Sequence, residues 1–458
     1  MRLTLIKPNL GRTGTKRYVD SGRMEPLQLG VLAGLTPPEY DVTLVDDRSE
    51  IIDPDRPTDL VALTVETFTA RRAYEIAEQY RRRGVPVVMG GMHPTLIPDE
   101  VAGYCDAVIT GDAEAVWPTV VQDAAAGRLQ ARYDGHIARP PQAGTRPRRD
   151  LFRGKGYLPI TLLQYSRGCR YRCSYCATSV FFDRSHQHRP VAEVVDEIRA
   201  QKRRYLFFVD DNITADHDAA KELFAALIPL KVRWVSQASL DMLRDPELMD
   251  LMVRSGCQGN VIGFESISTD SLIGMRKAVN RAAAADRYAG TIEQLRRLGL
   301  QTWAAFTIGH DADTIESIRA TCEFAIANKF TFAAYNILMP YPGTALYDDL
   351  AAQGRLLYDG QWWLHPEYRF NHAAFVPARM SPAELTRVGF ACRAKTNSVG
   401  SILRRLAEPR TNLRNPMRFA NFVAYNPLFR REVFKKQSMA LGYCEHTTPA
   451  RTPGRGDG

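Results

Sequence analysis

Residues 166–182 read S-R-G-C-R-Y-R-C-S-Y-C-A-T-S-V-F-F, and this stretch carries three of the eight cysteines in the chain. Cys169, Cys173 and Cys176 follow one another at spacings of four and then three residues. In reducing compartments cysteines ligate metals more often than they form disulfides. The spacing therefore predicts that the three thiolates together hold a metal centre.

Two kinds of metal centre suit this spacing. A zinc ion takes four tetrahedral ligands, which a C-x2-C pair such as Cys173 and Cys176 could provide together with Cys169 and either His186 or His188. A C-x3-C-x2-C loop suits a cubane iron–sulfur cluster with three protein ligands. Three thiolates leave the fourth iron open to a small molecule. The pattern favours the cluster, with the zinc site as the alternative.

The composition is that of a globular protein with two or three domains. The chain has 458 residues, of which 45% are apolar and 24% are charged, and its formal net charge is +9. It contains no uninterrupted apolar run of about 18 residues, the length that a membrane-spanning helix needs. The first residues lack the features of a secretory signal, so we expect a cytoplasmic protein.

The excess of positive charge is concentrated near the end of the chain. Residues 387–436 contain twelve Lys or Arg against two acids, Glu408 and Glu432. This region has two open interpretations: a solvated helical surface with its rings packed inward, or a surface that meets anionic partners or the inner face of a membrane. No nucleic acid partner is expected. The interleaved aromatic residues are Phe419, Phe422, Tyr425, Phe429 and Phe434.

The first 135 residues alternate between buried strands and helices. The alternation predicts a doubly wound parallel sheet, a Rossmann-like domain, and ligands of such domains lie beyond the carboxyl ends of the strands. The expected strands are residues 3–7, 41–45, 60–65, 85–89 and 107–110, and the clearest helices are residues 70–83 and 113–126.

A second alternating set follows a Pro-, Gly- and Arg-rich stretch, residues 136–157, which we expect to be a linker. Six strand–helix units predict a partial (β/α)6 TIM-like barrel over residues 158–365, with chemistry at the carboxyl ends of its strands. The cysteine loop directly follows the first of these strands. The remaining residues, 366–458, predict a basic, mostly helical segment with a frayed tail. The expected barrel strands are 158–165, 205–210, 232–238, 260–265, 302–308 and 332–339.

The C-x3-C-x2-C loop, with Tyr175 before its last cysteine, resembles that of the radical S-adenosylmethionine superfamily. Later strand ends agree: F-V-D-D-N at 208–212, G-F-E-S at 263–266 and P-Y-P-G-T at 340–344. The resemblance implies a 4Fe–4S cluster that binds S-adenosylmethionine at its open iron. The residues that it implies for S-adenosylmethionine are Tyr175, Asp210, Asp211, Asn212, Gly263, Glu265, Ser266, Pro342 and Gly343.

One strand end departs from the family pattern. The fifth barrel strand ends I-G-H-D-A-D-T at 308–314, where the family more often has G-x-P-x-E-T. His310 is therefore a candidate for substrate contact or proton transfer, with a surface turn histidine as the alternative. Gln237 and Ser239 are further candidates on the substrate side, because they are expected to face the mouth of the barrel.

The first domain resembles the cobalamin-binding domain that precedes the barrel in a subset of this superfamily. The motifs are G-G-M-H-P-T at 90–95 and V-I-T-G-D-A-E at 108–114, with Asp112 where the family has Glu. A D-x-H-x-x-G signature is absent, so His93 is interpreted as a guard of the lower cobalt face or as a turn-stabilising residue. A doubly wound domain without cofactor is the alternative. The implied cobalamin residues are Thr64, Thr67, Gly90, Gly91, His93, Gly111 and Glu114.

Together the resemblances imply a cobalamin-dependent radical S-adenosylmethionine C-methyltransferase. It would act on an unactivated carbon of a natural product, lipid or tetrapyrrole through a 5′-deoxyadenosyl radical and methylcobalamin, with flavodoxin or ferredoxin as electron donor. The cofactors would carry the hard chemistry, and the protein would orient them. Two alternatives stay open: a cyclase or rearrangement enzyme of the same family, and a binding protein that carries zinc or an iron–sulfur cluster.

Overall fold

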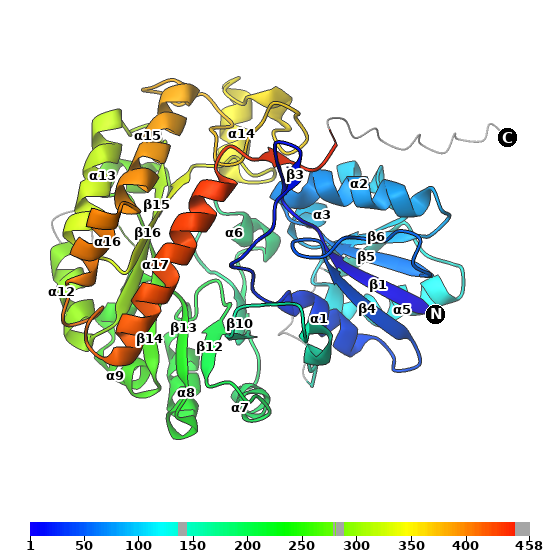
Figure 1. Ribbon diagram of the computed structural model, residues 1–458, viewed down its shortest axis with the longest axis horizontal. Coiled ribbons are helices and arrows are strands. Elements are labelled where there is room, and N and C mark those ends of the chain that lie inside the picture. Colours follow the sequence, from blue (N-terminus) through cyan, green and yellow to red (C-terminus); the bar gives the residue numbers. More distant parts are fainter. Residues whose placement is uncertain (136–143, 278–279, 281–287, 445–458) are drawn as a thin grey trace. The chain divides into compact units, whose positions relative to one another are not determined.

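The structure is a computed structural model, and it describes residues 1–135, 144–277, 280 and 288–444 (Figure 1). Contacts within the chain divide it into two compact units. Unit 1 comprises Met1–Leu158, Gln361–Phe370 and Ser438–Gly458, and unit 2 comprises Pro159–Gly360 and Asn371–Gln437. The basic C-terminal segment, which the sequence predicts as one region, is therefore divided between the units.

Unit 1 is built on a parallel six-stranded sheet, as the alternating pattern predicts. The strand order is β4-β1-β5-β6-β7-β8. Short apolar strands suit its centre, because both faces of a parallel sheet are covered. Sequence analysis does not predict β8, in which buried and exposed residues alternate over only four positions. The strands are β1 (Arg2–Lys7), β4 (Asp41–Asp46), β5 (Leu60–Thr64), β6 (Val87–Gly90), β7 (Ala107–Gly111) and β8 (Arg132–Gly135).

Helices cover both faces of this sheet, with α1 and α2 on opposite sides in Figure 1. The predicted helices at 70–83 and 113–126 correspond to α2 and to η2 followed by α5. Four short elements, η1, α3, α4 and η2, occupy the turns after β5, β6 and β7, where ligands of doubly wound domains bind. The elements are α1 (Leu27–Leu35), η1 (Thr67–Thr69), α2 (Ala70–Arg81), α3 (Met92–Leu96), α4 (Pro98–Ala102), η2 (Ala113–Ala115) and α5 (Trp117–Ala125).

Two distant segments complete unit 1. The strand β17 (Ala440–Leu441) pairs antiparallel with β2 (Gly11–Thr13), which also pairs with β3 (Lys16–Arg17). Residues 361–370 contribute Trp362 and Trp363, both of which are buried. Unit 1 therefore depends on residues that lie more than 200 positions after its sheet.

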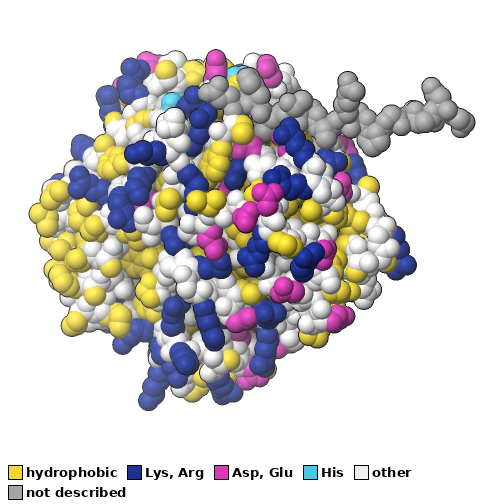
Figure 2. Space-filling view, turned by 45° about the vertical axis from the view of Figure 1, so that its right-hand side comes forward, with side chains coloured by type: hydrophobic (Ala, Val, Ile, Leu, Met, Phe, Trp, Pro, Cys, Tyr) yellow, Lys and Arg dark blue, Asp and Glu magenta, His cyan; other side chains and the backbone are white. Residues whose placement is uncertain are grey.

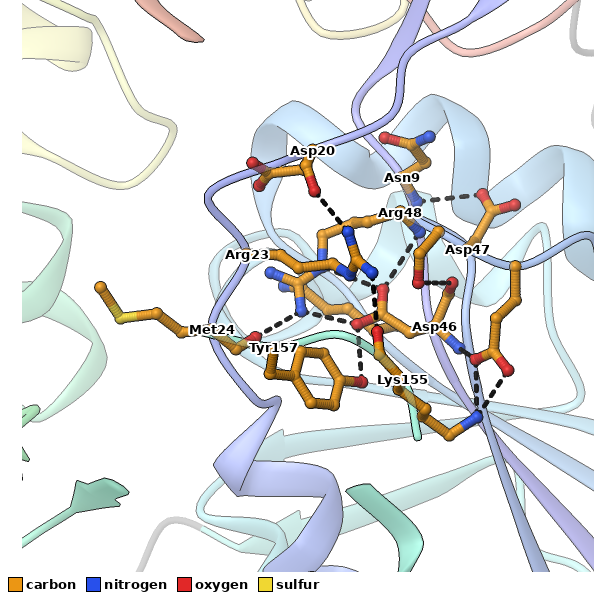
Figure 3. Close-up of polar contacts among 12 residues, drawn as sticks. Asn9, Asp20, Arg23, Met24, Asp46, Asp47, Arg48, Lys155 and Tyr157 are labelled. Carbon is orange, nitrogen blue, oxygen red and sulfur yellow. Dashed lines mark hydrogen bonds and ion pairs between the residues drawn. The ribbon is translucent and has the colours of Figure 1, made fainter. Parts of the chain in front are cut away.

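The end of the predicted linker is anchored on unit 1 by a polar network at the carboxyl end of β4 (Figure 3). The hydroxyl of Tyr157 donates to Asp46 at 2.9 Å, and the ammonium of Lys155 lies 2.6 Å from Glu50. Burial alone would raise the pKa of Asp46, but hydrogen bonds from Arg48 and Tyr157 hold it below its usual value. This part of the predicted linker is therefore packed against the domain that it follows.

Unit 2 contains a second parallel six-stranded sheet, in the order β16-β15-β14-β13-β12-β9, as expected for a partial barrel. Because all six strands are parallel, their carboxyl ends lie at one edge, which is where the cysteine loop begins. The strands are β9 (Thr161–Leu163), β12 (Tyr205–Phe208), β13 (Arg233–Ala238), β14 (Cys257–Glu265), β15 (Gln301–Ile308) and β16 (Phe332–Ile337).

Helices connect these strands and bury apolar side chains against the sheet. The predicted helix over 281–298 is described only from Tyr288, since 281–287 lie outside the described residues. A short antiparallel pair, β10 (Ser166–Gly168) and β11 (His186–His188), flanks the cysteine loop. The helices are α6 (Ala177–Phe181), α7 (Val191–Arg199), α8 (His217–Leu227), α9 (Pro246–Arg254), α10 (Thr269–Gly274), α12 (Tyr288–Leu298), α13 (Ile315–Ala327) and α14 (Ala345–Ala352).

Three further helices of unit 2 belong to the basic segment: α15 (Pro382–Thr396), α16 (Val399–Leu406) and α17 (Pro416–Lys436). A capping box formed by Ser381 and Glu384 begins α15. Among the described residues, no helix is both long and apolar enough to span a bilayer.

Candidate active site

The loop that carries the three cysteines is hydrogen-bonded through Ser174 to the end of α10 and the start of α14. The backbone N–H of Ser174 donates to the carbonyl of Met275 at 3.1 Å, and its carbonyl accepts from the N–H of Leu346 at 2.9 Å. Cys169, Cys173 and Cys176 are all half-buried free thiols. The structure therefore brings the cysteines to the carboxyl edge of the barrel sheet, beside the residues that follow β14 and β16.

Two aspartates after β12 hold the loop at its two ends. Asp210 is fully buried, and its carboxylate accepts from the N–H of Tyr165 at 3.1 Å and from the hydroxyl of Ser166 at 2.6 Å. Asp211 accepts from the N–H of Gly168 at 2.9 Å and lies 3.4 Å from the hydroxyl of Thr178. Gly168 directly precedes the first cysteine and Thr178 follows the third, so Asp211 spans the loop.

These contacts give Asp210 a structural task, and its role in binding S-adenosylmethionine stays a prediction of the resemblance. Burial raises the pKa of Asp210 to about 6, and hydrogen bonds from Ser166 and Tyr165 oppose the shift. Both oxygens of this buried carboxylate accept hydrogen bonds from residues that directly precede the cysteines. Asp210 therefore positions the cysteine loop in this structure.

The residues predicted for the substrate side lie next to this aspartate pair. The side-chain amide of Gln237 donates to the carbonyl of Asp210 at 3.3 Å, and the amide of Asn212 donates to the hydroxyl of Ser239 at 2.9 Å. The hydroxyl of Ser239 also donates to Asp241. At the ends of β12 and β13, Asn212 and Ser239 are thus hydrogen-bonded to each other, while the side chain of Gln237 is held by the backbone of Asp210.

A buried ion pair occupies the end of β14. The ammonium of Lys277 lies 2.9 Å from Oε1 of Glu265, and the hydroxyl of Thr307 donates to Oε2 at 2.7 Å. Glu265 has a φ of +63°, and a Cβ on Gly263 would approach its Oε1 to 2.2 Å. The G-F-E-S motif therefore needs glycine at its first position, so that the glutamate can fold back over the strand end.

Lys277 also acts on the cysteines. Burial raises the pKa of Cys173 to about 11, and the positive charge of Lys277 opposes that shift. Burial likewise raises the pKa of Cys169, with a further contribution from Cys176. A cation beside buried thiols stabilises their thiolate form, which is the form that binds iron. Sequence analysis misses Lys277, because a lysine 12 residues after a motif carries no recognisable spacing.

Tyr175 lies near Glu265, whose charge acts on it. Its ring is half-buried and packs against the barrel core, and burial followed by the charge of Glu265 raises its pKa. The segment between α10 and α12 holds the end of β14 in place: the amide of Asn280 donates to the carbonyls of Gly263 and Phe264 at 2.7 and 2.8 Å. Ser266 is buried in the same turn.

The turn after β16 has the form that P-x-P-G-T predicts. Gly343 has a φ of +75°, so Pro342 and Gly343 reverse the chain before α14. Thr344 caps α14 by accepting from the N–H of Tyr347 at 3.3 Å. Two residues later, Leu346 donates to Ser174, which ties this turn directly to the cysteine loop.

His310 is part of the turn after β15. Its Nδ1 accepts from the N–H of Ala312 at 3.3 Å, and a Cβ on Gly274 would lie 2.1 Å from the ring. Asp313 accepts from the N–H of Gly309 at 2.9 Å and from the hydroxyl of Ser271 at 2.7 Å. These contacts fit the turn-histidine alternative, in which His310 packs against α10.

The zinc alternative finds no support in the described part of the chain. There, no three Cys, His, Asp or Glu side chains converge as ligands of one ion. A cubane makes no such demand, since each thiolate binds a different iron. His188 instead stacks on Tyr165, with ring centroids 5.5 Å apart. Outside the loop, Cys105, Cys257, Cys322 and Cys392 are buried and Cys444 is exposed.

Unit 1 presents a second candidate site at the carboxyl ends of three neighbouring strands. Thr64 pairs with Gly90 at the ends of β5 and β6, and Gly111 ends β7. Gly91 has a φ of +112°, and a Cβ there would lie 2.9 Å from the carbonyl of Val65. The sheet therefore gathers the residues predicted for cobalamin, including half-buried Glu114 after β7, at one edge.

His93 lies in the interior of unit 1. The ring is fully buried, and its Nε2 lies 3.1 Å from the hydroxyl of Tyr74 and 3.2 Å from Oε1 of Glu100. Trp363 donates from its indole N–H to the same carboxylate at 3.1 Å. This network fits the turn-stabilising interpretation of His93 better than the interpretation as a guard of cobalt.

Two of the residues predicted for cobalamin have a buried polar atom without a hydrogen-bond partner: Oγ1 of Thr67 and Nδ1 of His93. Thr67 is buried, and its hydroxyl makes no hydrogen bond. Next to it, the ring of Phe68 packs on Trp362 and Phe370 at centroid distances of 4.8 and 4.9 Å. An unsatisfied hydroxyl beside glycine turns that allow close approach fits a ligand with amide arms such as cobalamin. Sequence analysis misses the contribution of Trp362, which comes from almost 300 residues later in the chain.

Comparison with known proteins agrees with this geometry. The family model of the radical SAM superfamily matches residues 163–325, which include the cysteine loop and β14. The chain is 30% identical over 394 residues to bacteriochlorophyllide d C-12(1)-methyltransferase of Chlorobaculum tepidum, covering 83% of this chain and 84% of that one. It is also 30% identical to the bacteriochlorophyllide d C-8(2)-methyltransferase of that organism, over 73% of this chain and 78% of the relative.

Solved structures show the same fold. The cobalamin-dependent S-adenosylmethionine radical enzyme OxsB, solved with aqua-cobalamin and S-adenosylmethionine bound, superposes with a TM-score of 0.64 at 13% identity. The match covers 94% of this chain and 71% of OxsB. With the motif geometry and the identity to the methyltransferases, it follows that the chain belongs to the radical S-adenosylmethionine superfamily and, within it, to the cobalamin-binding methyltransferase subfamily.

Proposed function

We propose that this protein methylates an unactivated carbon at the periphery of a tetrapyrrole. One observation carries the proposal: through Ser174, the loop with Cys169, Cys173 and Cys176 is hydrogen-bonded to Met275 and Leu346, in the segments that follow the G-F-E-S and P-x-P-G-T motifs. The similarity to two methyltransferases named for bacteriochlorophyllide d supports the tetrapyrrole class.

In the proposed site the three thiolates would hold a 4Fe–4S cluster with one open iron. The cluster with S-adenosylmethionine supplies a 5′-deoxyadenosyl radical, and cobalamin supplies the methyl group. Asp210 and Asp211 keep the loop in shape through Ser166 and Gly168. We assign Lys277 the task of favouring deprotonated thiols before the cluster assembles, because its charge lowers the pKa of Cys173 against the effect of burial.

The residues predicted for S-adenosylmethionine divide into two groups. Glu265, Ser266, Pro342 and Gly343 lie at the ends of β14 and β16, on either side of the cysteine loop. Their position supports a direct role in binding the nucleoside. Asp210 and Asp211, by contrast, would act on S-adenosylmethionine only through the loop that they hold.

In unit 1, the turns after β5, β6 and β7 would hold cobalamin. Gly91 lets the turn after β6 approach Val65, and Thr67 offers an unpaired hydroxyl to an amide arm. Since His93 is enclosed by Tyr74, Glu100 and Trp363, we propose that it stiffens this edge from inside.

The test combines anaerobic reconstitution with an isotope label. Protein reconstituted with iron, sulfide and cobalamin is reduced in the presence of methyl-deuterated S-adenosylmethionine and a bacteriochlorophyllide-type tetrapyrrole. We expect a product heavier by one deuterated methyl group together with 5′-deoxyadenosine. The Cys173→Ala variant should lose the cluster and both products while it retains cobalamin. Deoxyadenosine without labelled product would contradict methyl transfer and favour rearrangement.

The substrate class is tested separately. Tetrapyrroles that differ only in one alkyl substituent are offered in parallel with a pentacyclic hydrocarbon and with an aromatic amino acid. Turnover confined to the tetrapyrroles supports the proposal. Turnover of another class alone would leave the methyl transfer intact and overturn the substrate assignment.

A further inference from the structure

The helix α17 of unit 2 has mostly polar residues on its buried side and apolar residues on much of its exposed side. Three of its four buried residues, Arg418, Asn426 and Glu432, are polar, and the fourth is Phe422. Arg418 donates to the carbonyls of Cys257 and Gln258, and Asn426 donates to the carbonyl of Thr331 at 3.1 Å. Asn421 donates to the hydroxyl of Tyr205 at 2.8 Å. The buried side of α17 thus donates hydrogen bonds to backbone carbonyls at the amino ends of barrel strands. These ends lie opposite the edge that carries the cysteines.

The exposed side of the same helix is apolar. Over its first three turns the outward positions recur every three or four residues and include no charged side chain. Phe419 and Val423, one turn apart, are 44% and 45% exposed. The outward residues are Pro416, Met417, Phe419, Ala420, Val423, Ala424 and Pro427.

Neighbouring segments extend this face. On α16, Val399 and Leu403 point outward while Arg405 is buried and donates to the carbonyls of Phe330 and Thr331 at 3.1 and 2.7 Å. Seven of the twelve large exposed hydrophobic side chains among the described residues fall within this part of the chain. We call them, with the arginines below, the α16–α17 face: Val399, Leu403, Leu413, Met417, Phe419, Val423 and Phe434.

Exposed positive charge surrounds these apolar residues, and residues 387–436 contain no exposed acid; among the described residues, the one partly exposed acid that pairs with an arginine of this face is Glu293 of α12, 2.6 Å from Arg410. The segment's two acids, Glu408 and Glu432, are each only 5% exposed and lie in ion pairs with Arg296 and Arg410, and with Arg431 and Lys435. Figure 2 shows hydrophobic and cationic side chains together on its left-hand part, with few acidic ones. The exposed arginines of the segment are Arg404, Arg410, Arg414, Arg430 and Arg431.

The combination of exposed apolar and positively charged side chains indicates which of two partners binds the α16–α17 face: a second copy of the chain or a lipid surface. A second copy of the chain would pair the face with itself in a two-fold dimer, which would set the same arginines against each other without an acid between them. An anionic lipid surface accepts both features: aromatic and aliphatic side chains enter the headgroup boundary, and arginines contact lipid phosphates. Charge complementarity therefore selects the membrane.

We infer that the α16–α17 face binds the surface of an anionic bilayer, with the exposed side chains of Phe419 and Val423 inserted and the arginines on lipid phosphates. This contact lies on the surface only, since no described helix is fit to span a membrane. The inference stands independently of the proposed methyl transfer, because none of these residues belongs to the candidate active site.

The test is co-sedimentation of the full chain with vesicles, either pure phosphatidylcholine or an equal mixture with phosphatidylglycerol. We expect binding to the anionic vesicles alone, weakened by salt. The Phe419→Ser/Val423→Ser variant should bind at least about tenfold more weakly, since two apolar side chains no longer insert. The Arg414→Gln/Arg430→Gln variant should lose affinity mainly at low salt.

Matched controls use exposed residues elsewhere. Ile51→Ser removes an apolar side chain that is 86% exposed on unit 1, and Arg82→Gln removes an exposed arginine there. Both should bind like the unmodified protein, and circular dichroism should show that all variants are folded. Equal binding by every variant, or no binding to anionic vesicles, would overturn the inference. So would a dimer in light scattering that Phe419→Ser/Val423→Ser converts to monomer, which would assign the face to a second copy.

Discussion

The ammonium group of Lys277 lies 2.9 Å from the carboxylate of Glu265, and both side chains are largely buried beside the cysteine loop. Glu265 also accepts from Thr307, so each carboxylate oxygen has one partner. The pair connects the residues after β14 with the thiols of the loop. The pair therefore connects the packing at the end of β14 with the thiols that would bind the cluster.

Replacing Lys277 with methionine should destabilise unit 2. The change leaves the carboxylate of Glu265 buried without a cation, and breaking such a pair costs about 3 kcal/mol or more. Urea unfolding of the protein without cofactors measures the change. The Lys277→Met/Glu265→Gln variant removes the unpaired charge and should recover most of the loss. If the single variant is as stable as the parent, the pair contributes nothing to the fold.

Gly263→Ala should displace Glu265, because the added Cβ would lie 2.2 Å from its Oε1. We expect weaker binding of S-adenosylmethionine, measured by calorimetry on the reconstituted protein, with iron content retained. Gly290→Ala in α12 is the matched control: a Cβ there meets nothing within 4 Å, and alanine favours a helix by up to about 1 kcal/mol. Unchanged binding in Gly263→Ala would show that Glu265 does not contact the ligand.

Gly91→Ala should distort the turn after β6, at the edge of unit 1 that we propose binds cobalamin. Alanine at a φ of +112° is strained, and its Cβ would lie 2.9 Å from the carbonyl of Val65. We expect a loss of about 2–3 kcal/mol in stability and loss of cobalamin uptake, read from visible absorption, with a normal cluster.

Gly84→Ala is the control for Gly91→Ala, because it introduces backbone strain without a steric clash. Gly84 has a φ of +73°, and a Cβ there meets nothing within 4 Å. It should cost about 1 kcal/mol and leave cobalamin binding intact. Equal loss of cobalamin in both variants would mean that general destabilisation, rather than the turn after β6, explains the effect.

We expect the contribution of Asp210 to the free energy of unfolding to fall as the pH rises from about 4 to about 6. Its pKa is raised to about 6 in the folded protein, so over this window the folded state holds a proton that the unfolded state has lost. The stabilisation is complete below the unfolded pKa and disappears as the pH passes the folded pKa. The difference in free energy of unfolding between the parent and Asp210→Asn should therefore decline by on the order of 2–3 kcal/mol across the window.

Asp59 provides a control with the opposite sign. Hydrogen bonds from Arg2 lower the pKa of this exposed carboxyl to about 2, so its contribution is lost only as the pH falls below its unfolded value. The difference between the parent and Asp59→Asn should stay flat between pH 4 and pH 6. A flat profile for Asp210→Asn as well would show that Asp210 titrates normally.

Local sequence patterns were sufficient to predict the two parallel sheets and the main motifs. Five of the six strands in the parallel sheet of unit 1 and all six in the parallel sheet of unit 2 follow from short apolar runs, because a parallel strand buried on both faces leaves a continuous hydrophobic signal. The cysteine spacing likewise places three ligands on one loop. These features depend on neighbours within a few residues, so the order of amino acids is enough to predict them.

Other features depend on contacts between residues far apart in the chain, which spacing does not record. Lys277 beside Glu265 and Cys173, Trp362 beside Phe68, and the enclosure of His93 appear only when distant elements pack together. The outward face of α17 is the clearest case: the interleaved rings and charges suited either orientation. Only the packed helix shows that Arg418 and Asn426 point inward, because carbonyls at the strand ends need donors, and this leaves Phe419 and Val423 in solvent.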